Sequence, residues 1–186
     1  MIDAFTNGAD IHTSTAAAVF GVAPEDVTPE LRKRAKAVNF GIVYGIGDYS
    51  LSVDLGITKK QAGEYIANYL ARFHAIASYL KDTVRMAYDH GFVETIFGRR
   101  RYIPELKASN KMMRSFGERV AMNSPIQGSA ADIIKIAMVN TRNALAAANI
   151  DARLILQVHD ELVVEAARTC ADDAAMILRR EMENAV

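Results

Sequence analysis

The sequence predicts a mostly helical α+β fold, and three observations support this expectation. Long stretches repeat apolar residues every three to four positions, which is the period of an α-helix. Two short stretches, FVETIFGRRRYIP and LILQVHDELVVE, instead resemble pairs of strands around turns. With 186 residues, of which 51% are hydrophobic, the chain can bury a core in one domain or in two small ones.

Start and stop signals mark the first two helices. One helix is expected from His12 to Phe20. Thr28 and Pro29 then start a second one, because threonine caps a first turn well and proline fits the first helical position. Three glycines loosen the end of this second helix and suit a hinge: Gly41, Gly45 and Gly47.

Three further helices follow before the first pair of strands. Asp48 caps a short helix that ends near Gly56. Thr58 with Gln61 has the spacing of a capping box and starts the next helix. Another helix is expected from Ile76 to His90, where Gly91 stops it.

A long helical pattern begins near Ser109 in the second half of the chain. We expect Pro125 to interrupt it, because proline lacks the backbone donor and crowds the preceding turn. Ser129 and Asp132 have a capping-box-like spacing and should start a new helix that runs to about Ala148.

Two hairpins complete the expected elements. The first covers residues 92–103 and turns at Gly98. The second covers residues 153–165, with His159 and Asp160 at its tip. A last helix is expected to start near Thr169 and to run to the end of the chain.

Charge is balanced in total but segregated along the chain. The sequence has 22 basic and 22 acidic residues. Between positions 99 and 119 the acids are Glu105 and Glu118, and the bases are Arg99, Arg100, Arg101, Lys107, Lys111, Arg114 and Arg119. A neutral total can therefore hide a basic surface that binds nucleic acid, although a solvated face without a partner has the same composition.

Cysteine content and hydropathy limit the function class. Cys170 is the single cysteine, so an internal disulfide is excluded. There is no apolar run of 18 residues, so no membrane partner is expected. The start of the chain does not resemble a signal or transit segment, which makes a cytoplasmic location the default expectation.

The segment LRKRAKAVNFGIVYG carries the strongest functional signal. Arg32, Lys36, Phe40 and Tyr44 are four positions apart, so their side chains share one face of a helix. Two cations followed by two aromatic rings suit a triphosphate and a base, because cations hold phosphates and flat rings stack on bases. The alternative is an ordinary amphipathic helix with a basic face.

The tip of the second hairpin is a candidate metal site. Asp160 and Glu161 are adjacent carboxylates, and at a tight turn both can face one ion. Mg²⁺ takes carboxylate oxygens and leaves positions for phosphate. The alternative is a plain polar turn.

A third motif, Arg119, Asn123 and Gln127, again has a spacing of four. These donor side chains can reach the acceptors that every base pair shows in the minor groove. The alternative is helix capping near Pro125.

Taken together, the motifs resemble the bacterial DNA polymerase I family, the family A DNA polymerases. LRKRAKAVNFGIVYG resembles the family's nucleotide-binding helix in the fingers, and DIHT, with His12, resembles the stretch before it. GFVETIFGRRRYIPEL resembles the hairpin that follows. RVAMNSPIQGSAADIIK resembles the segment along the primer–template minor groove, and QVHDELVVE resembles the palm hairpin with a catalytic aspartate.

The resemblance implies transfer of deoxynucleoside triphosphates to the 3′ end of a primer, with two Mg²⁺ ions. It implies that Asp160 is catalytic and binds metal and that Glu161 supports it. The residues implied to bind the nucleotide are His12, Arg32, Lys36, Phe40 and Tyr44. The residues implied to contact primer–template DNA are Arg119, Asn123, Gln127 and His159.

The resemblance also predicts an organisation into fingers and palm. Residues 1–25 correspond to the lead-in from palm to fingers, residues 26–108 to the fingers with their hairpin near 92–103, and residues 109–186 to part of the palm.

One expected motif is absent from the sequence. The family takes a second metal-binding aspartate from a motif like DYSQIELR, and the DYS at Asp48 to Ser50 instead continues as the start of a short helix. We therefore expect a fragment that needs the remainder of a polymerase chain and is inactive by itself. The alternative is a non-catalytic module that binds primer–template or nucleotide.

Overall fold

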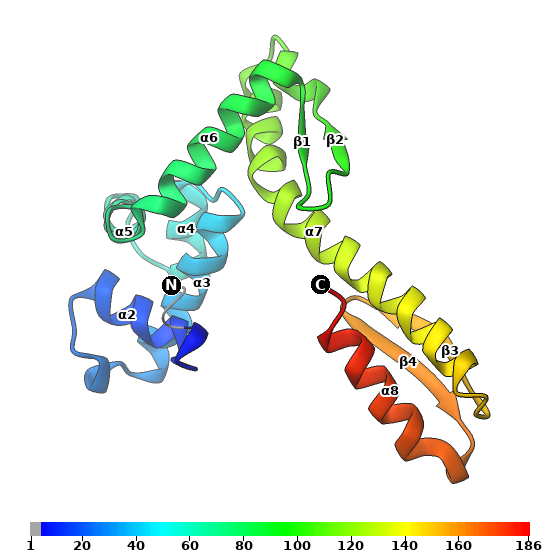
Figure 1. Ribbon diagram of the computed structural model, residues 1–186. Coiled ribbons are helices and arrows are strands. Elements are labelled where there is room, and N and C mark those ends of the chain that lie inside the picture. The colour runs from blue at the N-terminus through cyan, green and yellow to red at the C-terminus, as the bar shows by residue number, and fades with distance from the viewer. Residues whose placement is uncertain (1–4) are drawn as a thin grey trace. The chain divides into compact units, whose positions relative to one another are not determined.

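The computed structural model describes residues 5–186, so residues 1–4 of the predicted lead-in lie outside the described part. The described chain is mostly helical with two small two-stranded sheets, which confirms the predicted fold class (Figure 1). The helices are α2 (Ile11–Phe20), α3 (Pro29–Val43), α4 (Asp48–Leu55), α5 (Lys59–Arg72), α6 (His74–His90), α7 (Lys111–Ala147) and α8 (Ala171–Glu183). The strands are β1 (Phe92–Glu94), β2 (Arg100–Tyr102), β3 (Ala152–Val158) and β4 (Glu161–Ala166).

The chain divides into two compact units. Of the described residues, the first unit contains 5–93 and 101–123, and the second contains 94–100 and 124–186. This division falls inside α7 and inside the first hairpin, rather than at the boundary between 108 and 109 that the resemblance predicted. The assignment of fingers and palm to particular residues stays a prediction.

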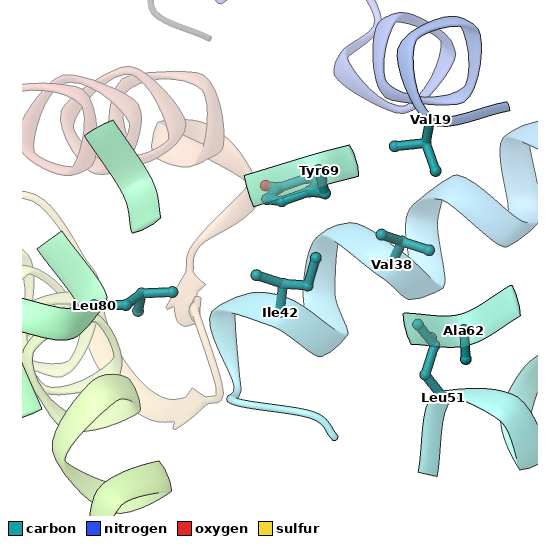
Figure 2. Close-up of a cluster of buried hydrophobic side chains, with 7 residues drawn as sticks. All are labelled: Val19, Val38, Ile42, Leu51, Ala62, Tyr69 and Leu80. Atoms are coloured by element: carbon teal, nitrogen blue, oxygen red, sulfur yellow. The ribbon is translucent and has the colours of Figure 1, made fainter. Parts of the chain in front are cut away.

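The core of the first unit fixes which side of α3 faces inward. Val38 and Ile42 on α3 are buried, and Figure 2 shows them in the same cluster as Val19 of α2 and Tyr69 of α5. Burial also raises the pKa of the Tyr69 hydroxyl. The full cluster contains Val19, Val38, Ile42, Leu51, Ala62, Tyr69 and Leu80. Because these apolar side chains hold one side of α3, its polar side is left for other contacts.

Local capping signals are confirmed at most helix ends of the first unit. The Thr28 side chain accepts a hydrogen bond from the backbone of Leu31 at 3.2 Å. Thr58 and Gln61 form the predicted capping box at the start of α5. Gly91 ends α6 with a left-handed φ of 78°. At α4 the capping position is Gly47, so Asp48 is the first helical residue rather than the cap.

The second unit packs α7 and α8 against the hairpin of β3 and β4. Its buried cluster contains Ile134, Ala137, Leu162 and Ala185. The two strands are antiparallel, and Val158 pairs with Glu161 next to the turn. The register shifts between Leu154 and Leu156, which indicates a bulge in β3.

The predicted interruption at Pro125 is wrong, because α7 is helical on both sides of this residue. Ser129, predicted to start a new helix, donates to the Pro125 carbonyl at 2.5 Å and accepts from the Ile96 backbone at 3.0 Å. Asp132 pairs with Arg99 at 2.8 Å instead of capping. A proline inside a helix costs about 3 kcal/mol, and we attribute the helix's continuity to contacts that an interrupted helix would lose.

The last helix also differs from its prediction. A short 3-10 segment covers Arg168–Cys170, and α8 then begins at Ala171 rather than near Thr169. It ends at Glu183 instead of continuing to the last residue. Among the described residues, no helix combines the length and apolar character that a membrane crossing requires.

Candidate functional site

Three of the four side chains predicted to share a face, Lys36, Phe40 and Tyr44, lie in consecutive contact along α3 and its C-terminal cap. The Lys36 amine lies 5.8 Å from the centroid of the Phe40 ring. The Phe40 and Tyr44 rings stack with centroids 6.4 Å apart and planes 17° apart. Phe40 is 47% exposed and Tyr44 is 41% exposed. The predicted neighbourhood of Lys36, Phe40 and Tyr44 is therefore confirmed, and it offers two aromatic surfaces beside a cation.

The end of α3 is ordered by a Schellman cap at Gly45. The Gly45 backbone donates to the Ile42 carbonyl at 3.0 Å, and Ile46 donates to the Gly41 carbonyl at 2.7 Å. Gly45 has a φ of 71°, which glycine adopts without a steric penalty. Tyr44, as the residue before this turn, has its backbone held by the cap. A hinge at these glycines stays a prediction.

Arg32 is held by Asp10, a residue to which the sequence reasoning gave no role. The Arg32 Nε donates to Asp10 Oδ2 at 2.5 Å. This bond, and a second one from the Thr13 hydroxyl at 2.7 Å, keeps the pKa of Asp10 well below its usual range. Asp10 also accepts from the backbone of His12 and caps α2. A guanidinium has five N–H donors, so this contact leaves Arg32 with donors for another anion.

His12 is close to the Phe40 ring and within electrostatic range of Arg32 and Lys36. Its ring centroid is 5.9 Å from that of Phe40. Its Nδ1 lies 3.0 Å from the amide nitrogen of Asn39. Burial lowers the pKa of His12; nearby Asp10 opposes this, whereas Arg32 and Lys36 lower the pKa further. The imidazole therefore favours its neutral form.

A pocket of about 570 Å³ adjoins the end of α3 in the first unit. It is lined by Ala37, Phe40, Gly41, Tyr44, Gly45, Ile46, Gly47, Ser50, Asp54 and Arg119. Arg119 therefore shares a pocket with the two aromatic residues, although the sequence motif placed it in a separate group. Asn123 is half-buried, and its Oδ1 has no hydrogen-bond partner among the described residues.

The other predicted site residues belong to the second unit. Gln127 is an exposed residue of α7. His159 and Asp160 form the two-residue loop between β3 and β4, and Glu161 is the first residue of β4. His159 has a left-handed φ of 53°, and its carbonyl accepts from the Gln157 side chain at 2.6 Å.

The loop between β3 and β4 fits one part of a metal site. Asp160 and Glu161 are exposed, so both carboxylates are accessible. Within residues 5–186, no group of three or more His, Cys, Asp or Glu side chains is arranged to hold a metal ion. Mg²⁺ is commonly bound by one or two protein carboxylates together with substrate phosphates. The donor set is therefore compatible with Mg²⁺ and incomplete by itself.

The structure thus brings together His12, Arg32, Lys36, Phe40 and Tyr44, and it adds Arg119 to their surroundings. The sequence reasoning missed the buried pair that supports His12, formed by Thr15 and Asn39. The sequence offered one signal for Asn39: it is a polar residue that directly follows the apolar Val38.

Comparison with known proteins assigns the chain to a family. The model of DNA polymerase family A matches residues 1–186, and the chain belongs to this family. It is 54% identical to DNA polymerase I of Caldicellulosiruptor bescii and 53% identical to DNA polymerase I of Bacillus subtilis. Each match covers 100% of this chain but 22% and 21% of those proteins, so the chain spans about a fifth of their length.

A solved structure supports the same assignment. The POL domain of Pol1 from M. smegmatis, in complex with DNA primer-template and dNTP, matches this chain with a TM-score of 0.92 and 43% sequence identity. The match covers 100% of this chain and 33% of that one.

Proposed function

We propose that this chain supplies the nucleotide-binding helix and part of the catalytic centre of a DNA-directed DNA polymerase. The reaction is transfer of a deoxynucleoside triphosphate to a primer 3′ end, copied from a template. The observation that supports this most directly is the series Lys36, Phe40 and Tyr44, exposed and in consecutive contact, in a chain of DNA polymerase family A. The similar POL domain is described in complex with primer-template and dNTP.

The first unit supplies the contacts to the incoming nucleotide in this proposal. Lys36 and Arg32 bind the triphosphate through charge-assisted hydrogen bonds, and His12 adds a neutral donor. Phe40 packs against the sugar and base, and Tyr44 lies near the templating position. The stacked geometry of the two rings favours this assignment, because a flat base can extend the same stack.

Asp160, with Glu161 in support, holds a divalent cation in this proposal. The finer assignment is Mg²⁺, with two ions in the complete enzyme. Bound there, the ions would supply positive charge to the attacking primer oxygen and the leaving pyrophosphate. The exposed loop that carries Asp160 leaves this carboxylate accessible to substrate phosphate.

Primer–template DNA is the second partner. Arg119, Asn123 and Gln127 supply donors to the minor groove, and His159 lies by the primer end. The remainder of the polymerase chain completes the centre in this proposal, because residues 5–186 contain no group of three or more His, Cys, Asp or Glu side chains that could hold a metal ion. The cytoplasmic location expected from the sequence stays a prediction.

Equilibrium binding of a fluorescent deoxynucleoside triphosphate, followed by anisotropy with Mg²⁺ present, tests the nucleotide site. Lys36→Ala should weaken binding about tenfold or more, because a hydrogen bond to a charged group contributes about 1.5–3 kcal/mol. Arg34→Ala is the matched control, since Arg34 points away from Lys36 on α3 and pairs with Glu30 at 3.3 Å. Equal weakening by both variants would refute the assignment.

A labelled primer–template duplex separates the polymerase from a non-catalytic binding module. We expect binding that weakens with salt and with Arg119→Ala, and no primer extension by these 186 residues. Extension that requires Mg²⁺ and is abolished by Asp160→Ala would show that the isolated chain is catalytically complete. Duplex binding combined with unchanged nucleotide affinity in Lys36→Ala would favour the binding module.

A further inference from the structure

A buried polar chain connects the interior of the first unit to His12. Thr15 of α2 is fully buried, and Asn39 of α3 is 8% exposed. The Thr15 hydroxyl donates to Asn39 Oδ1 at 3.0 Å. Asn39 Nδ2 lies 3.0 Å from His12 Nδ1. Thr15 thus holds Asn39, and Asn39 in turn contacts the imidazole of His12.

The orientation of the Asn39 amide in the structure sets the direction of these hydrogen bonds. Because the threonine hydroxyl bonds the amide oxygen, the amide nitrogen faces the ring. An amide nitrogen is a donor and cannot accept, so His12 Nδ1 must be the acceptor. A neutral imidazole that accepts at Nδ1 carries its proton at Nε2.

We propose that Thr15 and Asn39 are positioning residues that hold His12 as the neutral tautomer protonated at Nε2. In this form the ring donates one hydrogen bond to an anionic oxygen bound beside Arg32 and Lys36. The identity of that anion, the triphosphate of the incoming nucleotide, rests on the proposed function. The tautomer does not depend on it.

The charges around His12 agree with a neutral ring. Arg32 and Lys36 of α3 disfavour a third cation at this place, while Asp10 favours one and is engaged by Arg32. Burial of the ring is the largest influence that lowers its pKa. A neutral donor adds a directed hydrogen bond to the two cations without adding to their mutual repulsion.

Nitrogen NMR of the 186-residue chain, labelled with ¹⁵N-histidine, tests the tautomer directly. The chain has four histidines, and a His12→Gln variant identifies the His12 resonances. In the wild type we expect Nε2 protonated and Nδ1 unprotonated over the neutral pH range. A wild-type ring protonated at Nδ1 would overturn the proposal.

Thr15→Val and Thr15→Ser form the matched pair. Valine has the shape of threonine without the hydroxyl, so the Asn39 amide loses the contact that orients it and can turn its oxygen to the ring. We expect Thr15→Val to populate the Nδ1-protonated form and to raise the pKa of His12, whereas Thr15→Ser keeps both at their wild-type values. The proposal fails if Thr15→Val leaves tautomer and pKa unchanged.

Asn39→Asp supplies a second, stronger perturbation. A carboxylate accepts a hydrogen bond from a protonated Nδ1 and cannot donate one, so the tautomer should reverse. The pKa of His12 should rise by about one unit or more, because an opposite charge within hydrogen-bond range favours the imidazolium. If this variant does not fold, as judged by circular dichroism, the Thr15 pair decides the question.

Nucleotide binding separates this inference from the proposed function. If Thr15→Val changes the tautomer and weakens binding of the fluorescent nucleotide about fivefold, the size expected for loss of one hydrogen bond, both hold. A changed tautomer with unchanged nucleotide affinity supports the positioning role and counts against His12 as a nucleotide ligand. An unchanged tautomer overturns the positioning role whatever the affinity.

Discussion

Gly128 of α7 offers a test of how the first hairpin is held in the second unit. A Cβ built on Gly128 would lie 2.7 Å from Cγ2 of Thr95, whereas carbon atoms normally approach to about 3.5–4.0 Å. Thr95 is short and cannot swing away, and its hydroxyl also accepts from the backbones of Phe97 and Arg99 at 3.3 and 3.1 Å. Gly128→Ala must therefore displace the hairpin.

Two opposing terms set the size of the effect. Alanine improves helix propensity by about 1 kcal/mol, and forcing a methyl group into a filled space costs about 1–3 kcal/mol. The net result for Gly128→Ala is a loss of about 0–2 kcal/mol in the second unit. Thr95→Ser removes the clashing methyl and keeps the hydroxyl, so Gly128→Ala in that background should gain about 1 kcal/mol.

The coupling between the two sites is thus about 1–3 kcal/mol in a double-mutant cycle. Native-state hydrogen exchange is the assay, because two compact units need not unfold together. The Ile96 amide, which donates to Ser129 Oγ at 3.0 Å, reports on the hairpin. Gly63→Ala in α5 is the control, since its Cβ would meet no atom within 4 Å. Coupling below about 0.5 kcal/mol would refute the reasoning.

Two further predictions concern the first unit. Asp10→Asn should make the thermal stability fall less steeply below about pH 4. The pKa of Asp10 is lower in the folded state than in the unfolded state. Its ion pair with Arg32 therefore stabilises the fold above the unfolded pKa, and this stabilisation is lost as pH falls through the folded pKa. Identical acid profiles for variant and wild type would contradict this. Gly45→Ala should lose about 1 kcal/mol more in urea unfolding than Gly56→Ala, because both have positive φ but a Cβ on Gly45 would clash with the Met122 side chain and lie 3.0 Å from Cγ of Arg119. Equal losses would show that this contact does not matter.

The features predicted correctly from the sequence depend on neighbouring residues. The capping box at Thr58 and the end of α6 at Gly91 are set within a few positions, so their residue types suffice. The shared face of α3 follows from helical geometry in the same way. The candidate nucleotide-binding side chains of α3 could therefore be grouped by their four-residue spacing alone.

The features that could not be predicted depend on contacts between distant positions. Pro125 should end a helix by local rules, but Ser129 meets a backbone 33 positions away and α7 continues. Asp10 meets Arg32 across 22 positions, and Thr15 meets Asn39 across 24. No spacing rule relates such pairs, because the loops and helices between them decide whether they meet.

The left-handed backbone at His159 limits which sequences can occupy the hairpin loop. Valine, isoleucine and threonine are strongly disfavoured at a φ of 53°, whereas glycine, asparagine, aspartate and histidine tolerate it. The backbone conformation therefore restricts which residue types can occupy position 159, independently of any ligand that the side chain contacts. His159→Asn would keep the loop conformation and remove the imidazole. This substitution therefore separates the role of His159 in the backbone turn from any role of its imidazole.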